Sequence, residues 1–267
     1  MPKKMRTTPQ LKVLLMSSIT APPDCNVVEL RQYTLHPGQR DVLIELFDRE
    51  FVETQEAVGI TVIGQFRDLD DPDRFVWLRG FADMDSRRRS LAAFYDGPVW
   101  KAHREAANTT MIDSDNVLLL RPAWPGAGIV IRRRGHGCGH GNQRAAVSRA
   151  GQSAGVVEVH LFQLHAPADS QTLSRSYRDA GASVLGWYVT ELAPNNFSRL
   201  PVREGEHLLV GLMTFGDLAA QAALTAVDHL QRGAPLPFAS GLARPRHRLS
   251  LAPTARSRLL VGDINHG

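Results

Sequence analysis

The sequence predicts an α+β protein made of two tandem ferredoxin-like (βαββαβ) units. Three pairs of similar segments recur along the chain in the same order, with matching glycine, aliphatic and aromatic positions. Self-similarity of this kind indicates a duplicated structural unit. The pairs are 27–35 with 156–164, 59–66 with 181–188, and 74–84 with 207–217.

The first unit begins with a predicted strand and a predicted helix. Residues 27–35 alternate in side-chain character, and the Pro-Gly pair that follows ends the strand. The next segment places Leu43, Phe47 and Phe51 on one helical face, and Gly59 ends the helix.

Two strands, a second helix and a last strand complete this unit. The strands are expected at 60–68 and 74–82, joined by an Asp- and Pro-rich turn. A helix begins near Ser86, is interrupted by Asp-Gly-Pro and resumes at Pro98, a residue suited to a first helical turn. Residues 116–123 form the closing strand.

The second unit is expected to repeat this order. Its first strand lies at 156–164 and its first helix at 169–181, followed by two further strands. A second helix is expected at 217–232, and a short final strand near 247–252.

A βαββαβ unit packs both helices on one face of its sheet and leaves the other face bare. A second copy packed sheet to sheet would cover that face, which predicts a dimeric-type α/β barrel, closed within one chain or across a homodimer. The expected divisions are a disordered or loosely ordered N-terminus at 1–26, a first unit at 27–123, a Gly- and Arg-rich linker at 124–154, a second unit at 155–255, and a tail at 256–267.

The faces of the first strand are assigned by polarity. We expect Val28 and Leu30 to face the helices, and Glu29, Arg31 and Tyr33 to point into the space between the two sheets. By the same polarity, Trp77 and Arg79 are expected to point inward, with Phe75 and Phe81. In the strand 60–68, Gln65 is expected to share one face with Thr61 and Ile63. The candidate ligand-binding residues are therefore Glu29, Arg31, Tyr33, Gln65, Trp77, Arg79, Glu158 and His160.

An aromatic pocket with a few convergent polar groups is typical of small-molecule sites. A structural role is the other interpretation of these residues. Buried charges are normally paired, and inward aromatic residues form the core of most proteins.

Several of these segments resemble the NIPSNAP family, a branch of the dimeric α/β-barrel superfamily. The resemblance rests on the Glu-x-Arg-x-Tyr strand, the following Pro-Gly pair, and Tyr95, Pro98 and Trp100, and it covers residues 27–123. The stretch 156–232 is similar to the second unit of bacterial members. The resemblance implies the barrel fold and no established activity.

The function expected from the sequence is binding of a small, partly apolar molecule between the facing sheets. One alternative, implied by related superfamily members, is a cofactor-free monooxygenase. Glu29, His103 or His160 would then act as the base, and Arg31 or Arg79 would stabilise an oxyanion. A purely structural or protein-interaction module is the remaining alternative, and the catalytic residues are left unassigned.

No cofactor or metal is expected. A haem protein is a minor alternative, because no haem-attachment motif accompanies its candidate ligands, which are His160, His165, His207 and His229. His136, Cys138 and His140 alternate in a Gly-rich segment that does not hold the geometry of a zinc site.

Charge, hydropathy and cysteine content limit which kinds of binding partner are expected. A net charge of +4 over 267 residues, with the excess in segments that read as solvated, argues against nucleic-acid binding. No stretch reaches the roughly 20 apolar residues that span a membrane. Two cysteines form no disulfide framework, so we expect a cytoplasmic protein. From the bare sheet faces and the dimeric-type barrel we expect a homo-oligomer, in the form of a dimer.

Overall fold

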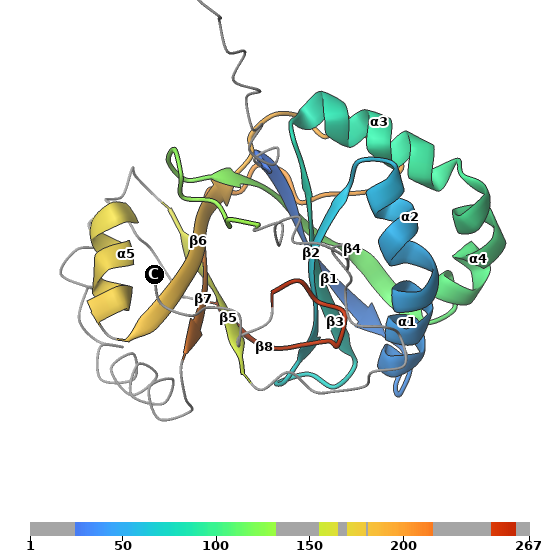
Figure 1. Ribbon diagram of the computed structural model, residues 1–267, viewed down its shortest axis with the longest axis horizontal. Coiled ribbons are helices and arrows are strands. Elements are labelled where there is room, and N and C mark those ends of the chain that lie inside the picture. The colour runs from blue at the N-terminus through green and yellow to red at the C-terminus, as the bar shows by residue number, and fades with distance from the viewer. Residues whose placement is uncertain (1–24, 132–154, 165–169, 180, 216–246, 260–267) are drawn as a thin grey trace, which may run out of the picture.

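The computed structural model describes residues 25–131, 155–164, 170–179, 181–215 and 247–259 (Figure 1). The helix predicted at 217–232 lies outside these residues. So do most of the predicted linker, most of the predicted C-terminal tail and nearly all of the predicted N-terminal segment, whose boundaries stay predictions.

The first unit contains the predicted elements in the predicted order. The helix after the first strand is interrupted by a π-helical segment. The elements are β1 (Val27–Leu35), α1 (Arg40–Leu46), the π-helical segment (Phe47–Phe51), α2 (Val52–Ala57), β2 (Thr61–Asp68), β3 (Arg74–Phe81), α3 (Met84–Tyr95), α4 (Pro98–Asn108) and β4 (Met111–Pro122).

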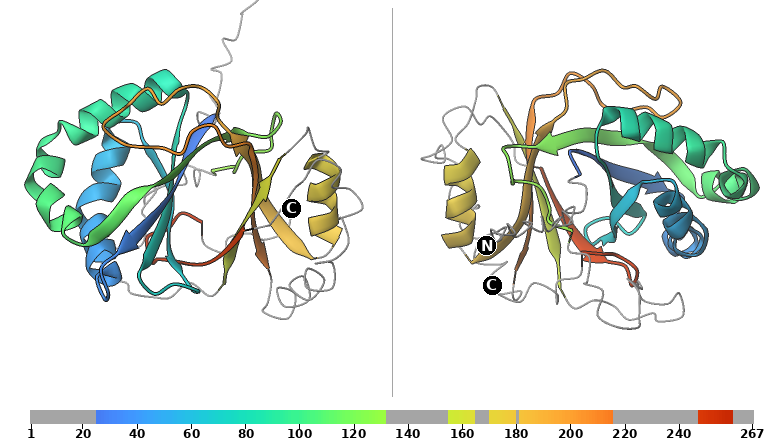
Figure 2. Two further views of the ribbon diagram at one scale, coloured as in Figure 1. Left: turned by 180° about the vertical axis from the view of Figure 1, so that it is seen from behind. Right: turned by 45° about the horizontal axis from the view of Figure 1, so that its top comes forward.

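The second unit repeats this order over its described residues. Figures 1 and 2 show its helix α5 on the opposite side of the molecule from the helices of the first unit. Its elements are β5 (Val157–Gln163), α5 (Ser170–Asp179), β6 (Ala182–Thr190), β7 (Leu208–Phe215) and β8 (His247–Pro253).

The eight strands form one closed antiparallel barrel in the order β1-β3-β2-β8-β5-β7-β6-β4. Each unit contributes a half-sheet with its strands in the same spatial order. The halves join where β2 pairs with β8 and where β4 pairs with β6. The barrel therefore closes within one chain, and neither sheet face needs a second copy to cover it.

Glycines mark the repeat in the structure as they do in the sequence. Gly59 and Gly181 end the helices that precede β2 and β6, with φ of +89° and +87°, a backbone conformation that other residues rarely adopt. The pairing register shifts at Gly64 in β2 and at Gly186 in β6. The two units thus share a helix end and a β-bulge at matching positions.

The space between the half-sheets is filled mainly by aliphatic side chains, all at most 6% exposed. With two aromatic residues, Phe66 and Tyr188, they are Val28, Leu30, Ile63, Val76, Leu78, Leu118 and Leu120 from the first unit, and Val157, Val159, Leu161, Leu208, Val210, Leu212, Leu249 and Leu251 from the second.

The predicted assignment of strand faces was therefore wrong. Val28 and Leu30 lie in the barrel interior, whereas Tyr33 packs with helix residues such as Phe47 on the other side of the sheet. Glu29 and Arg31 alternate with the interior residues and share the side of Tyr33. The physical reason is that polar side chains need polar partners. The helices supply such partners, and packed aliphatic side chains between two sheets do not.

The predicted face of β2 was wrong as well. Ile63 lies in the barrel interior, but Gln65 is on the helix side, where its Nε2 donates to Asp48 Oδ1 at 3.0 Å. The bulge at Gly64 breaks the two-residue alternation between them.

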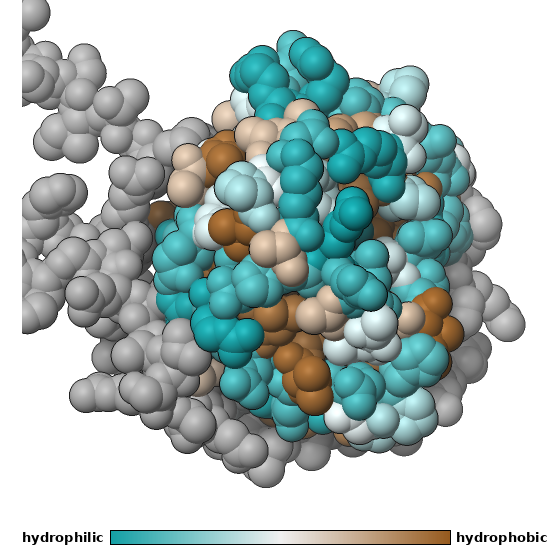
Figure 3. Space-filling view, turned by 90° about the vertical axis from the view of Figure 1, so that its right-hand side faces the viewer, coloured by the Kyte–Doolittle hydropathy of each residue, from teal (hydrophilic) through white to brown (hydrophobic). Residues whose placement is uncertain are grey.

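The outer surface of the first unit is mainly hydrophilic, with hydrophobic residues in small separate patches (Figure 3). Of the helices in the described part of the chain, none has the length and hydropathy needed to cross a membrane.

The packed interior predicts the effect of a truncation at Leu78. Leu78 is fully buried between the half-sheets, and Leu69, in the turn after β2, is 54% exposed. Leu78→Ala is expected to lower the free energy of unfolding by about 2–5 kcal/mol, and Leu69→Ala by less than about 0.5 kcal/mol. Urea unfolding of both variants measures this; similar losses would contradict the packing described here.

Candidate functional site

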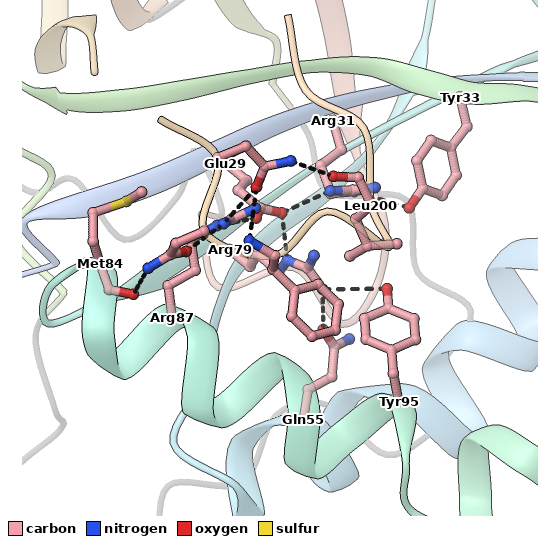
Figure 4. A network of polar contacts seen from close by, with 12 residues as sticks. Glu29, Arg31, Tyr33, Gln55, Arg79, Met84, Arg87, Tyr95 and Leu200 are labelled. Carbon is pink, nitrogen blue, oxygen red and sulfur yellow. Dashed lines mark hydrogen bonds and ion pairs between the residues drawn. The ribbon is translucent and has the colours of Figure 1, made fainter. Parts of the chain in front are cut away.

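A buried charge cluster lies between the first half-sheet and its helices (Figure 4). We call Glu29, Arg31, Arg79 and Arg87 the Glu29 centre. Arg31 Nη1 and Arg79 Nε each donate to Glu29 Oε2 at 2.7 Å, and Arg87 Nε donates to Oε1 at 2.7 Å. All four side chains are at most 2% exposed. One carboxylate therefore holds three guanidinium groups.

Strand register and one helix bring these residues together. Glu29 of β1 lies directly opposite Arg79 of β3, and Arg31 follows two residues later on the same face. Arg87 comes from α3, whose start is set by Asp83, because Asp83 Oδ1 accepts a hydrogen bond from the backbone N of Ser86 at 2.6 Å.

Aromatic rings surround the guanidinium groups. The Arg79 guanidinium carbon lies 5.1 Å from the centre of the Trp77 ring and 5.9 Å from that of Tyr95. The Arg31 carbon lies 5.4 Å from the Tyr33 ring, and Arg31 Nε donates to Tyr33 Oη at 2.9 Å. These ring faces partly replace the water that the buried cations have lost.

Three nitrogen donors in and beside the centre are buried without a hydrogen-bond partner in the described part of the chain. They are Arg79 Nη2, Arg87 Nη2 and Trp77 Nε1. The neighbouring Arg79 Nη1 has only long contacts, at 3.3 Å to Gln55 Oε1 and 3.5 Å to Tyr95 Oη. The centre thus has more donors than acceptors.

The electrostatics fix the charge state of the carboxylate. Burial alone would raise the pKa of Glu29, but the charges of Arg79, Arg31 and Arg87 outweigh burial and hold that pKa well below its usual value. Burial lowers the pKa of Arg87, and the attraction of Glu29 offsets part of this. Burial also raises the pKa of Tyr33. Glu29 is therefore ionised, and it is a poor general base because its pKa lies far below neutral pH.

A segment of the second unit covers the centre. We call residues 191–207, between β6 and β7, the strap; Figure 2 shows it running over α3. Asn195 Oδ1 and Asn196 Oδ1 accept from Arg87 Nη1 at 3.0 and 2.9 Å. Asn196 Nδ2 donates to the backbone O of Met84 at 2.6 Å. The strap supplies amide groups but no charge to the centre.

The second unit has a matching but different polar group. His160 Nε2 lies 2.8 Å from Glu158 Oε2, and His160 Nδ1 lies 2.9 Å from Tyr177 Oη of α5. Ser250 Oγ donates to Glu158 Oε1 at 3.0 Å, and Arg248 Nε lies 3.5 Å from Oε2. Met213 lies opposite Glu158 where Arg79 lies opposite Glu29. Among the residues that the structure describes, one arginine thus lies near Glu158, where three donate to Glu29.

The structure brings five predicted site residues together at the Glu29 centre and leaves the other three apart. Glu29, Arg31, Tyr33, Trp77 and Arg79 form the centre and its aromatic wall. Gln65 lies apart and contacts Asp48, and Glu158 with His160 belongs to the second unit.

Sequence reasoning missed Arg87, Gln55, Tyr95, Asn195 and Asn196, which complete the surroundings of the centre. Arg87 is one of three consecutive arginines in the sequence. The available sequence signal was its spacing of four residues from Leu91, which places both on the same, buried face of α3. The asparagines carried no sequence signal of this contact.

The remaining candidates lie elsewhere. His103 Nε2 lies 3.5 Å from Glu50 Oε2 and is a third exposed, away from the Glu29 carboxylate. Among the described residues, His, Cys, Asp and Glu form no group of three or more that would hold a metal ion. His136, Cys138 and His140 lie outside those residues, as do His165 and His229.

Several solved structures resemble this chain. An uncharacterised NIPSNAP-like domain protein from Burkholderia xenovorans is 28% identical, over 36% of this chain and 84% of that chain, with a TM-score of 0.34. A NIPSNAP family protein from Agrobacterium tumefaciens is 21% identical, over 36% of this chain and 92% of that chain, with a TM-score of 0.34. A candidate monooxygenase from Lactobacillus acidophilus is 11% identical, over 85% of this chain and 93% of that chain, with a TM-score of 0.49. No curated protein matches the chain.

The fold and the site define a tandem ferredoxin-like α/β barrel with an arginine-rich centre under the helices of its first unit. The NIPSNAP family model matches residues 28–124, which make up this first unit. The NIPSNAP-like character of the second unit stays a prediction.

The Glu29 centre predicts a pH-dependent loss of stability on Glu29→Gln. Removing the carboxylate leaves three buried guanidinium groups without their counter-charge, so the free energy of unfolding near pH 7 should fall by about 3–5 kcal/mol. The folded-state pKa of Glu29 is lowered, so its stabilisation is complete above the ordinary value of 4.5. It declines as the pH falls below that value, by about 1.4 kcal/mol per pH unit, until the folded pKa is passed.

Urea unfolding of wild type and Glu29→Gln at pH 3, 4, 5 and 7 measures this difference. It should shrink below pH 4.5 and stay constant above about pH 5.5. A difference that does not change with pH would contradict the assignment of an ionised Glu29.

Proposed function

We propose that this protein binds a small anionic molecule with an apolar or aromatic part at the Glu29 centre, on the helix side of the first half-sheet. The proposed site lies here and not in the cavity that was expected between the sheets, because aliphatic side chains fill the barrel interior. The ligand-binding candidates kept in the proposal are Glu29, Arg31, Tyr33, Trp77 and Arg79, joined by Arg87.

The observation that carries the proposal is the imbalance of charge and donors. Three buried guanidinium groups surround one carboxylate, and Arg79 Nη2, Arg87 Nη2 and Trp77 Nε1 are buried without a partner in the described chain. A buried donor without an acceptor costs about 1–3 kcal/mol, and an uncompensated buried charge costs more. A bound carboxylate or phosphate would supply both the acceptors and the negative charge.

The surroundings favour a ligand that also has an apolar part. Trp77, Tyr95 and Tyr33 lie around the guanidinium groups. Phe197 of the strap lies beside Tyr95, with ring centres 6.0 Å apart and the rings tilted by 33°. Access would come from movement of the strap, because its asparagine oxygens are neutral acceptors that an anion would outcompete for Arg87.

A structural role is the second candidate. The aromatic rings 5.1–5.9 Å from the arginine carbons stabilise cations without any ligand. The centre would then serve only to fix α3 and the strap against the sheet. Neither candidate requires a reaction. For the compartment we propose the cytoplasm, on the scarcity of cysteine in the sequence.

Tryptophan NMR signals test the ligand proposal. The chain has four tryptophans, so a proton–nitrogen spectrum of the full chain shows four indole N–H signals, and Trp77→Phe identifies that of Trp77. Titration with benzoate or phenyl phosphate is expected to shift the Trp77 signal to saturation. Uncharged benzyl alcohol should not shift it. Arg87→Gln should weaken binding by about tenfold or more, the loss of a charged hydrogen-bond donor.

Arg104→Gln is the matched control, because Arg104 is exposed on α4, and it should bind as wild type does. Arg87→Lys, which keeps the charge and loses the planar donors, covers the case in which Arg87→Gln does not fold. A Trp77 signal that no anion shifts, or equal binding by the Arg87 variants, would exclude the ligand proposal.

The double variant Glu29→Leu with Arg31→Met tests the structural candidate. A purely structural role predicts that no anion shifts the Trp77 signal of the wild type. It also predicts that this variant is less stable, because Arg79 and Arg87 keep their charge and lose the Glu29 carboxylate. Ligand binding at the centre predicts that the titration is lost in this variant, whatever its stability.

A further inference from the structure

The two units end their last strands in the same way. After β8 the chain crosses β2, where the backbone N of Thr254 donates to Gln65 O at 2.9 Å. After β4 it crosses β6, where the backbone N of Ala123 donates to Trp187 O at 3.0 Å. Gln65 and Trp187 each follow the bulge glycine of their unit. The two crossing segments are therefore equivalent, starting at Thr254 and at Ala123.

In the first unit this crossing is sealed by ion pairs to α2. Arg258 Nη2 lies 2.8 Å from Glu56 Oε1. Arg256 pairs with Glu53 and donates to the backbone O of Asp48. Arg256 is only 6% exposed. The gap between α2 and β2 is thus closed by opposite charges.

The second unit has a different pattern of charge at the equivalent positions. When the two crossing segments are aligned at Thr254 and Ala123, the two arginines that close the first gap align with uncharged residues of the other segment. When the two helices are aligned at the glycines that end them, Gly59 and Gly181, the two glutamates of the first helix align with arginines of the second. The matches are Arg256 with Pro125, Arg258 with Ala127, Glu53 with Arg175 and Glu56 with Arg178. Within the described residues neither Arg175 nor Arg178 has an ion pair.

A pocket of about 360 Å³ lies where the seal is missing, between α5, β6 and the segment after β4. We call it the α5–β6 pocket. Arg175 and Arg178 line it together with Trp124, Ser174 and Trp187. Its volume is within the range of small-molecule sites.

The wall of this pocket contains buried polar atoms without partners. Ser174 is 2% exposed and Trp187 1% exposed, and neither Ser174 Oγ nor Trp187 Nε1 has a hydrogen-bond partner in the described chain. In the first unit the residue that matches Ser174 is Val52, which is fully buried. The second unit thus carries a hydroxyl and an indole N–H where the first has an aliphatic residue and an amide bonded to Asp48.

We infer that the α5–β6 pocket binds a small molecule that has a carboxylate or phosphate group and a flat apolar part. Arg175 and Arg178 supply the positive charge, and the planar guanidinium group suits both kinds of anion. Ser174 and Trp187 supply hydrogen-bond donors, and the indole rings of Trp124 and Trp187 offer flat apolar contact. This site is separate from the Glu29 centre and does not depend on it.

The tryptophan NMR spectrum also tests this site, because Trp187→Phe identifies the Trp187 indole signal. Phenyl phosphate and benzoate, each titrated into the full chain, are expected to shift the Trp187 signal to saturation, and the tighter of the two identifies the favoured anion. Benzyl alcohol should not. Arg175→Glu with Arg178→Glu restores the acidic pattern of the first unit and should weaken binding at least tenfold. Ser174→Val should weaken it less.

Arg88→Glu with Arg104→Glu makes the same change of charge at exposed positions of α3 and α4 and should leave the Trp187 titration unchanged. Arg87→Gln should also leave it unchanged, which separates this site from the Glu29 centre. Because Arg175 and Arg178 are exposed, their double variant is expected to fold. A Trp187 signal that neither anion shifts, or equal binding by the double variant and wild type, would overturn the inference.

Discussion

The structure depends on the burial of one aliphatic face of each half-sheet against the other. Val28, Leu30 and Leu78 of the first unit, and Val159 with Leu212 of the second, occupy an interior from which water is excluded. Among the described elements, no other covers this face in either half, because the helices lie on the opposite side of each half-sheet (Figure 1). Apolar burial therefore holds the two units together, and the charged side chains Glu29, Arg31 and Arg79 find their partners on the helix side of the sheet.

Duplication then allowed the two helix-covered faces to diverge. Both units keep a glutamate on the first strand, Glu29 and Glu158. Arg87 of α3 donates to Glu29 directly, whereas Tyr177 of α5 contacts His160, which contacts Glu158. The first unit surrounds its glutamate with arginines and covers it with the strap, so charge is concentrated in a closed space. The second unit uses His160 and Tyr177, and it leaves a pocket open beside α5. One scaffold thus presents two different chemical environments.

Strand positions, helix positions and the repeat were predictable from the sequence, because they follow from local periodicity and turn residues. The faces were not. β1 is buried on both sides, so alternation alone does not say which side meets the helices, and the partners that decide it lie far along the chain: Arg87 is 58 residues from Glu29. The bulge at Gly64 reversed the alternation that Gln65 was expected to follow. The pocket beside α5 could not be predicted from the sequence either, because it depends on charged residues that differ between the two units.

The claim that each half-sheet needs the other is tested most directly by expressing the first unit alone, as residues 25–131, and measuring its mass in solution by sedimentation. The aliphatic face left bare should make it assemble with a second copy of itself, giving a dimer or a larger species at micromolar concentration. A monomer that unfolds cooperatively and binds no hydrophobic dye would show that the face needs no cover, and would contradict the account.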